Sequence, residues 1–512
     1  MERKWWTLVL VCVATFMLLL DITIVNVALP SIQKSLHASF DDLQWVIDAY
    51  SLTLAALLLT AGSLADLLGR KRVFILGLAV FTVASLLCGL SNRPLVLNLS
   101  RGLQGIGGAM MFATSLALLA QEFHGRERGT AFGIWGATVS AAAAVGPLVG
   151  GALTQGLGWE YIFFLNLPIG AAAIALSVVR LGESRDPESA RVDWAGLITF
   201  SAGLFLLVLA LIRGNDAGWG STQIVLELAG AGAMLVLFLI AELSQARPML
   251  DLTLFRKPTF GGASIAAFAV SAAMFAMFLY ITLYYQNILG LSPVQTGWRF
   301  LPLTVVAFFV SPLGGRLYGK LPPRVLMGLG LGLVAVALFL MHGVAVDSSW
   351  TTLLPGFVVT GVGLGILNPS LAQTAVGVVP PARSGMASGI NNTFRQVGVA
   401  TGIAGLGAIF QHQVTSKVTD LIAGTPAASF VASHGDAVKQ LSSGGGGSLA
   451  SAPPDVRAKL AGAGTQAFVS GFNELLIVGG IVAAGGALLT FALVRRRDFV
   501  ESSAPMVEAA AG

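Results

Sequence analysis

The stretch "LLLDITIVNVALP", from Leu18 to Pro30, continues an apolar run that begins at Leu8 and contains one carboxylate, Asp21. A run of about 20 apolar residues is long enough to cross the hydrocarbon core of a membrane as a helix. An ionised carboxylate is costly in that core unless it is paired or hydrated, so such a residue is a candidate for function. The stretch therefore predicts a membrane-spanning helix with Asp21 as a functional side chain.

The composition of the whole chain agrees with a membrane location. Of the 512 residues, 55% are hydrophobic and only 11% are charged, whereas an average soluble domain has roughly 25% charged residues. The mean hydropathy is +0.80. Cys12 and Cys88 both lie in apolar stretches, which argues against a disulfide framework or a paired metal site. We expect an all-α polytopic membrane protein.

Apolar stretches separated by polar breaks predict fourteen transmembrane helices in three groups. The first six lie near residues 7–29, 43–64, 73–91, 95–118, 130–154 and 161–180. Two more lie near 194–213 and 222–243, and the last six near 259–285, 297–318, 325–344, 352–378, 386–411 and 471–494.

The positions of the basic residues orient these spans. With the N-terminus inside, most of the 30 Lys and Arg residues fall in cytoplasmic segments, as the positive-inside rule requires. Both termini are therefore expected in the cytoplasm. This distribution also accounts for the net charge of +5, which is no argument for nucleic-acid binding. Arginine outnumbers lysine, and glycine and alanine abound, which favours a bacterium of high GC content as the source. We expect the protein in the bacterial cytoplasmic (inner) membrane.

Weak internal repeats indicate two parallel six-helix halves, an arrangement common in transporters. Gly129, Ala131 and Gly133 recur with the same spacing at Gly385, Ala387 and Gly389, and Trp45 and Gly62 recur at Trp298 and Gly315. We expect an N-terminal six-helix half (1–185), a two-helix insert (186–258), the first five helices of the C-terminal half (259–411), a long extracytoplasmic loop (412–470), a last transmembrane helix (471–497) and a cytoplasmic tail (498–512).

The expected loop at 412–470 is polar, rich in small residues and contains "SSGGGGS". This composition is typical of a flexible spacer. Docking of a partner outside the membrane is the less favoured interpretation.

Several stretches in this order resemble the fourteen-span drug:proton antiporters of the major facilitator superfamily, the multidrug and antibiotic efflux type. The likeness rests on "LLLDITIVNVALP", "QWVIDAY", "GSLADLLGRKR", "RGLQGIGGA", "GPLVGGAL", "LYYQNILGLSP" and "GMASGINNTFRQVG". Two departures are Ala142, where the family's antiporter motif usually has glycine, and "WEY" (Trp159–Tyr161), where "WRW" is common.

The resemblance implies the major facilitator fold and proton-coupled export of lipophilic drugs, antibiotics or related small molecules by alternating access. It implies no cofactor, because the proton gradient supplies the energy, and no enzymatic activity. The alternatives are a proton-coupled importer, or a dedicated metabolite or lipid exporter, of the same fold. A membrane-embedded enzyme is a remote alternative.

Three charged residues within the spans are candidates for proton coupling at a central site: Asp21, Asp48 and Arg101. Arg101, Gln104 and Gly105 share one helix face. A guanidinium buried there needs acceptors, and Asp21 or backbone carbonyls of the first span are the candidates. The structural alternatives are that Asp21 only orients helices, that Asp48 is simply hydrated, and that Arg101 only ties helices together.

Candidates for the substrate cavity combine amide, guanidinium, aromatic and thioether side chains, since adaptable apolar pockets suit varied lipophilic ligands. They are Asn26, Gln104, Met277, Tyr280, Tyr284, Asn391 and Arg395. Ordinary packing is the alternative for each of them. Arg395 could bind a carboxylate, a backbone oxygen or an anionic part of the substrate.

Two motifs are candidates for gating and close packing. The first motif contains Gly146, Pro147, Gly150 and Gly151. Small residues at every fourth position let helices approach closely, and proline bends a span. The second contains Gly62, Asp66, Gly69 and Arg70. Asp66 is expected to accept hydrogen bonds from a helix N-terminus of the other half, while Arg70, Lys71 and Arg72 are expected to anchor in lipid headgroups.

Other site chemistries have little support. Gly314 to Lys320 spells most of a nucleotide-binding loop, but Leu321 stands where Ser or Thr is required, so we expect no ATP binding. The histidines (His37, His124, His342, His412 and His434) are scattered without metal-ligand spacing, so we expect no metal. The expected partners are a small lipophilic substrate, protons and the lipid bilayer. The sequence does not specify an oligomeric state.

Overall fold

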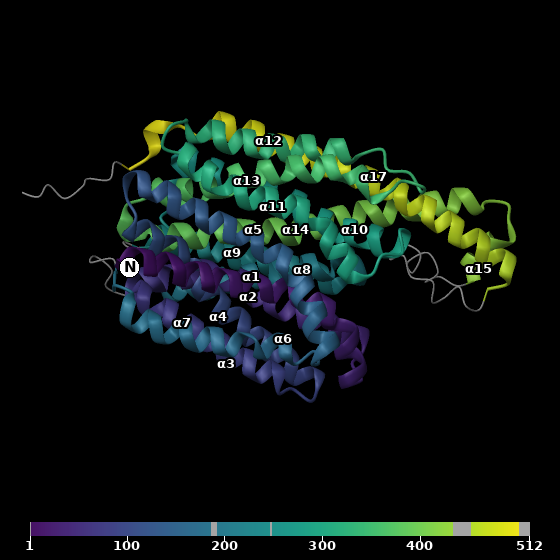
Figure 1. The fold of residues 1–512 in the computed structure, drawn as a ribbon, viewed down its shortest axis with the longest axis horizontal. Helices are drawn as coiled ribbons and strands as arrows, with labels where there is room; N and C mark the ends of the chain where they lie inside the picture. The colour runs from purple at the N-terminus through teal and green to yellow at the C-terminus, as the bar shows by residue number, and fades with distance from the viewer. Residues whose placement is uncertain (1, 186–191, 246–247, 434–451, 501–512) are drawn as a thin grey trace, which may run out of the picture.

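The computed structural model describes residues 2–185, 192–245, 248–433 and 452–500, and in these ranges every long element is a helix. The helices run roughly side by side along the long axis of the molecule (Figure 1). The two ends of the described chain lie at the same end of this bundle (Figure 1). We call this the terminal end; it holds Arg3, Arg70 and Asp498, and the opposite end is the far end.

The first helices form the N-terminal half, which contains its own hydrophobic core. They are α1 (Arg3–Leu36), α2 (Phe40–Leu68), α3 (Arg70–Gly89), α4 (Pro94–Glu122), α5 (Gly125–Gly156), α6 (Tyr161–Phe164) and α7 (Asn166–Arg180). Each predicted span of this half coincides with a helix, and the sixth is divided between the short α6 and α7.

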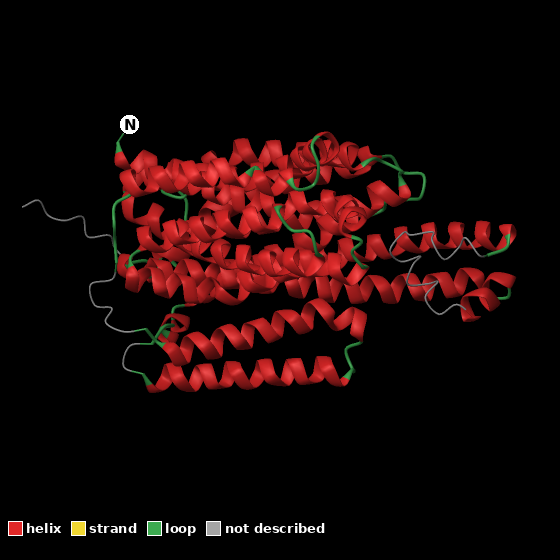
Figure 2. Cartoon of the chain, turned by 90° about the horizontal axis from the view of Figure 1, so that it is seen from below, coloured by secondary structure: helices red, strands yellow, loops and turns green. Residues whose placement is uncertain are grey.

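A pair of helices follows, α8 (Trp194–Ala217) and α9 (Thr222–Ser244), at the positions expected for the insert. The two pack against each other, and α8 also contacts α2 and α14. Figure 2 shows the pair at the edge of the bundle. Each of the two helices begins with a side chain that caps it: Asp193 accepts the Gly196 N–H, and Ser221 accepts the Ile224 N–H.

The C-terminal half has a second large core. Its helices are α10 (Pro258–Leu283), α11 (Pro293–Leu317), α12 (Pro323–Met341), α13 (Leu354–Gly377), α14 (Ser384–Ile422), α15 (Pro426–Ser433) and α17 (Pro454–Leu493). A π-helical turn, Tyr284–Ile288, extends α10.

The prediction of a long loop at 412–470 is wrong over much of this range. Helix α14 continues to Ile422 and α17 begins at Pro454, and their extensions project beyond the bundle at the far end (Figure 1). Each extension has an apolar stripe at helical spacing that packs in the core of the C-terminal half. The stripe was not evident because the polar residues around it keep the overall hydropathy of the segment low. It consists of Val414, Val418 and Ile422 on α14 and of Val456, Leu460 and Ala463 on α17. The "SSGGGGS" segment lies outside the described residues.

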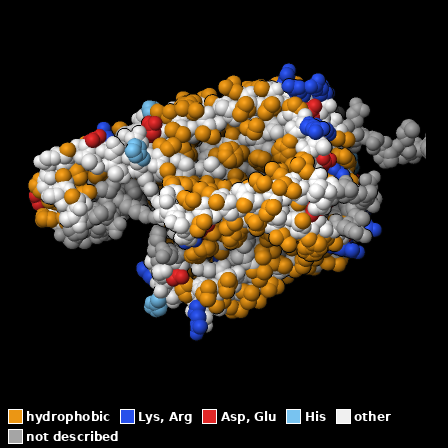
Figure 3. Space-filling view, turned by 180° about the vertical axis from the view of Figure 1, so that it is seen from behind, with side chains coloured by type: hydrophobic (Ala, Val, Ile, Leu, Met, Phe, Trp, Pro, Cys, Tyr) orange, Lys and Arg blue, Asp and Glu red, His pale blue; other side chains and the backbone are white. Residues whose placement is uncertain are grey.

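Twelve of the described segments are long and apolar enough to cross a membrane. Helices α5 and α14 are not among them, so this finding does not establish the expected number of fourteen. Both are nevertheless long, with 32 and 39 residues. Helix α5 packs against α1 and α11, and α14 packs against α2, α10 and α17. A broad hydrophobic surface runs along the helices, and Lys and Arg side chains gather toward the ends (Figure 3).

The two halves meet along two helix pairs, α2 with α14 and α5 with α11. Gly62 of α2 faces the carbonyl of Gly385 so closely that a methyl group at Gly62 would overlap it, and Gly129 of α5 faces Gly315 of α11 in the same way. The repeat predicted from the sequence relates Gly62 to Gly315 and Gly129 to Gly385. The two contacts are thus repeat equivalents, and both bring the halves together toward the terminal end.

Candidate functional site

A buried polar cluster surrounds Asp21 within the N-terminal half. Arg101 of α4 forms an ion pair with Asp21, and Gln104 donates from Nε2 to Asp21 Oδ1 at 2.8 Å. Asn166 of α7 lies 3.4 Å from the same carboxylate oxygen. Ser85 of α3 accepts hydrogen bonds from both Gln104 and Asn166, at 2.8 and 3.2 Å. One carboxylate therefore joins four helices, α1, α3, α4 and α7.

Arg101 has more partners than the carboxylate. Its Nε donates to the carbonyl of Val46 at 2.9 Å, and its Nη1 donates to Gln104 Oε1 at 2.7 Å. Its guanidinium carbon lies 4.3 Å from the centre of the Tyr50 ring, a distance at which a cation and an aromatic face attract each other. The carbonyl of Val46 belongs to the second span, whereas a carbonyl of the first span was expected.

The cluster is closed to solvent in this conformation. Asp21 and Arg101 each have 1% of their surface exposed, and Gln104 has none. Gln104, which was expected to line the substrate cavity, instead connects Asp21 to Ser85. Ser85 and Asn166 were not among the predicted site residues. Each is a polar residue inside an apolar span, and this pattern could have identified them.

Three other residues were expected at or near this site: Asp48, Asn26 and Pro147. Asp48 is half-buried on α2. The backbones of Asn26 and Pro147 lie in α1 and α5, but their side chains are outside the described part of the structure.

The aromatic and thioether candidates of α10 and of the π-helical turn that extends it pack inside the C-terminal half. Met277 is fully buried in its core. The ring of Tyr280 lies 4.5 Å from that of Phe410, and the ring of Tyr284 stacks on Phe472 at 5.5 Å. These contacts are with α14 and α17 of the same half, so in this conformation the three side chains form core rather than a surface facing the N-terminal half.

A second polar group lies on α14 where it passes between the halves. Arg395 donates from Nη2 to Asn368 Oδ1 of α13 at 3.1 Å. Asn391 is 3% exposed, and its Nδ2 has no hydrogen-bond partner among the described residues. The neighbouring Asn392 donates to the carbonyl of Phe112, on α4 of the other half, at 3.4 Å. Both predicted residues of α14 thus lie beside the boundary between the halves.

The terminal end is closed by Asp66. Its carboxylate accepts the backbone N–H groups of Gly385 and Met386, at 3.0 and 2.8 Å, at the beginning of α14. These groups are unpaired within a helix, and the helix dipole favours a negative charge there. The expected contact of Asp66 with a helix N-terminus of the other half is therefore confirmed.

Arg70 reinforces this contact and does not anchor in headgroups as expected. It is 3% exposed, pairs with Asp66 at 2.8 Å and donates to the carbonyls of Pro381 and Ala382, each at 2.7 Å. Gly69 makes the geometry possible because its φ of +113° lets α2 turn directly into α3. The sequence alone does not distinguish Arg70 from its exposed neighbour Arg72, but the tight turn directs Arg70 back toward Asp66 and the other half.

The glycines of α5 bring that helix against α1. A methyl group at Gly146 would overlap Thr23, and one at Gly150 would lie 2.8 Å from Ile24 Cγ1 and 2.9 Å from its carbonyl oxygen. Gly151 faces Val294 of α11. The close packing predicted from the spacing of these residues is confirmed.

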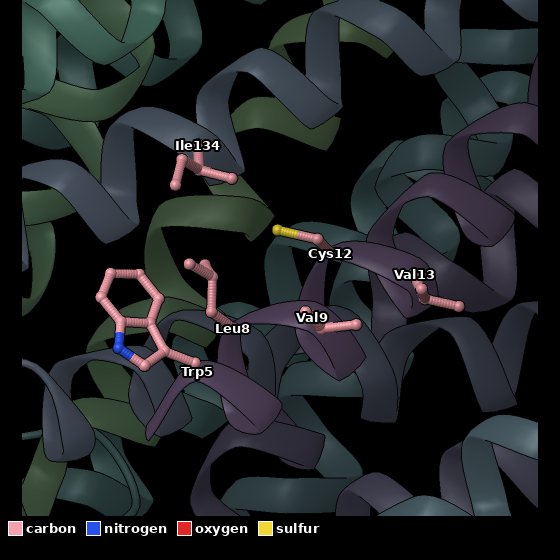
Figure 4. A pocket seen from close by; sticks show the side chains of 6 residues that line it. All are labelled: Trp5, Leu8, Val9, Cys12, Val13 and Ile134. Carbon is pink, nitrogen blue, oxygen red and sulfur yellow. The ribbon is translucent and has the colours of Figure 1, made fainter. Parts of the chain in front are cut away.

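An apolar groove of about 370 Å³ lies between α1 and α5. Its lining residues, shown in Figure 4, are Trp5, Leu8, Val9, Cys12, Val13 and Ile134. It contains none of the predicted site residues. Among the residues that the structure describes, no group of His, Cys, Asp or Glu is arranged to hold a metal ion.

Comparisons with known proteins agree with this architecture. The family model of the Major Facilitator Superfamily matches residues 11–403. The chain is 38% identical over 404 residues to "Multidrug resistance protein Stp" of Mycobacterium tuberculosis, covering 79% of this chain and 75% of that protein. It is 34% identical to the "Tetracenomycin C resistance and export protein" of Streptomyces glaucescens, covering 82% and 78%.

Its fold is similar to a solved structure described as the human organic anion transporter MFSD10, with a TM-score of 0.61 and 15% identity. That match covers 94% of this chain and 100% of the human chain.

Proposed function

The chain belongs to the Major Facilitator Superfamily, and from this premise we propose that it exports lipophilic drugs, antibiotics or related small molecules in exchange for protons. Relatives that are named for multidrug resistance and antibiotic export support this substrate class. The single observation that carries the proton-coupled mechanism is the buried ion pair of Asp21 and Arg101. The protein then needs no cofactor and performs no catalysis, because the proton gradient supplies the energy.

In the membrane we assign fourteen spans to the chain, the twelve apolar segments together with α5 and α14. Helix α5 lies between α1 and α11, and α14 lies between α2, α10 and α17, so both share the orientation and depth of their neighbours. The terminal end carries Arg3, Lys4, Lys71 and Arg72, and by the positive-inside rule this charge supports a cytoplasmic location for it. Both termini are then cytoplasmic, in a bacterial inner membrane.

With that orientation the structure corresponds to a state closed toward the cytoplasm. Asp66, Arg70 and the contact of Gly62 with Gly385 hold the halves together at this end. Alternating access requires the contacts to break when the protein opens inward. They are short, numerous and confined to one end, as a reversible gate requires.

Asp21 is connected to helix packing by its position in α1. Thr23 and Ile24, two and three residues later, are the residues that meet Gly146 and Gly150 of α5. A proton on Asp21 removes the negative charge that pairs with Arg101 and accepts a hydrogen bond from Gln104. Arg101 is then an unpaired charge in a buried site, and the free-energy cost of that charge favours a rearrangement. Helix α1 can transmit that rearrangement to α5, and α5 to α11 of the other half.

The test is dye transport driven by a pH gradient in inverted membrane vesicles that contain the full chain or Asp21→Asn. A panel of fluorescent lipophilic compounds, cationic and uncharged, is supplied outside. Uptake that collapses with the gradient and is lost in Asp21→Asn supports proton-coupled export through this carboxylate.

Three other outcomes contradict parts of the proposal. Uptake that survives in Asp21→Asn moves the coupling to Asp48 or elsewhere. Dye movement in the opposite direction identifies an importer. No movement of any compound contradicts the broad substrate class and favours a dedicated substrate or an importer.

A further inference from the structure

We propose that Arg395, together with Asn391 of α14 and Asn368 of α13, binds an acidic group of the exported molecule, a carboxylate or a similar oxyanion. This inference rests on the proposed transport function and names a substrate class for it. It follows from a difference between the two arginines that lie inside the spans.

Arg101 is fully compensated, whereas Arg395 is not. Arg101 has a carboxylate, an amide oxygen, a backbone carbonyl and an aromatic face around it. Within the part of the chain that the structure describes, Arg395 forms one hydrogen bond, to the neutral amide oxygen of Asn368, and no ion pair. Its Nε is buried without a partner. A guanidinium at membrane depth normally pairs or faces water, because an uncompensated charge is costly there.

Asn391 adds a second unpaired donor on the same helix face. It precedes Arg395 by four residues, so the two side chains are neighbours on α14. In the described part of the structure its Nδ2 has no hydrogen-bond partner, although only 3% of the residue's surface is exposed. Buried amide groups are nearly always hydrogen-bonded in folded proteins. Two adjacent groups that both have free donors call for a ligand rich in acceptors, and the planar fork of arginine matches a carboxylate in two-point geometry.

The position of this group is that of a substrate site between the halves. Asn392, between the two donors in sequence, contacts the backbone of Phe112 on α4, so the N-terminal half packs against a neighbouring face of the same stretch of α14. Arg395 follows Gly385 by ten residues, about 15 Å along a helix. It therefore lies inward of the closed terminal end, near mid-membrane, and its side chain is half-buried rather than enclosed. A ligand held there would lie beside the boundary between the halves.

The experiment compares two fluorescent ligands that differ only in charge, pyrenebutyrate and its methyl ester. Each is titrated against the full chain in lipid nanodiscs. We expect the unaltered protein to bind the carboxylate at least tenfold more tightly than the ester. Arg395→Gln should abolish this preference, and Arg395→Lys should keep part of it. Arg213→Gln is the matched control, because it removes a positive charge on α8 that is paired with Glu227, and it should keep the preference.

Each contrary result overturns the inference. Equal affinities in the unaltered protein, failure to bind either ligand, or an unchanged preference in Arg395→Gln would show that Arg395 does not select an acidic group. Displacement of the carboxylate by an equal concentration of chloride or inorganic phosphate would assign the site to a small anion instead. The melting temperatures of the variants establish that they are folded. Failure of the proposed transport function is distinguishable from failure of this inference, because vesicles would then move none of the uncharged compounds.

Discussion

Asp66 of α2 accepts the backbone N–H of Met386 at 2.8 Å, in the first turn of α14 and hence in the opposite half of the protein. One turn earlier on α2, Gly62 meets Gly385 with no room for a side chain. Charge and packing therefore close the same end at the same place. Because the two contacts differ in kind, they can be tested separately.

Replacing Asp66 by Asn should weaken the closed end while keeping the shape of the side chain. Hydrogen bonds to a charged group contribute about 1.5–3 kcal/mol, so the amides of Gly385 and Met386 should exchange hydrogen roughly tenfold faster or more. Hydrogen exchange measured by mass spectrometry on the peptide that begins α14 checks this. Asp251→Asn is the control, because its ion pair with Arg383 is partly exposed and such pairs contribute little. Equal exchange in both variants would contradict the role of Asp66.

Replacing Gly62 by Ala should separate α2 from α14, since the added methyl group would overlap the carbonyl of Gly385. We expect the transport rate to fall at least severalfold and the exchange of the α14 peptide to rise. Gly332→Ala in α12 is the matched control, because nothing lies within 4 Å of the added methyl group. In a helix that substitution should be neutral or stabilise the protein by about 0.5–1 kcal/mol. Normal transport by Gly62→Ala would show that the close contact is not needed.

The helices could be predicted from hydropathy, and the partner of Asp66 from the chemistry of helix N-termini. Asp21 could be named as one of two candidate partners of Arg101, beside backbone carbonyls of the first span, since opposite charges in apolar spans need compensation. The carbonyl of Val46 could not be predicted, because it depends on how α2 and α4 pack. Nor could the direction of Tyr280, since an apolar helix such as α10 has no polar face that distinguishes core from cavity.

Replacing Arg101 by Gln should destabilise the protein strongly, because removing one partner of a buried ion pair leaves the other unpaired, at a cost of about 3–5 kcal/mol. The stability of Arg101→Lys should lie between those of the unaltered protein and Arg101→Gln. An ammonium group keeps the charge but has no planar fork with which to reach Asp21, Gln104 and the Val46 carbonyl together. Thermal unfolding of the purified variants measures both effects. In the double variant Asp21→Asn/Arg101→Gln, part of the loss should be recovered. Additive losses would show that the pair does not act as a unit.

Replacing Gly150 by Ala should impair transport through the contact of α5 with α1. The new methyl group would lie 2.8 Å from Ile24 Cγ1 and 2.9 Å from the Ile24 carbonyl oxygen, so the helices must separate by a few tenths of an ångström. Since Asp21 lies less than one turn from Ile24, we expect the rate of proton-driven dye uptake to fall at least severalfold. Gly156→Ala, in the same helix but with nothing within 4 Å of the added group, should transport normally. If both variants transport alike, close packing of α5 on α1 does not link the carboxylate to the movement of the halves.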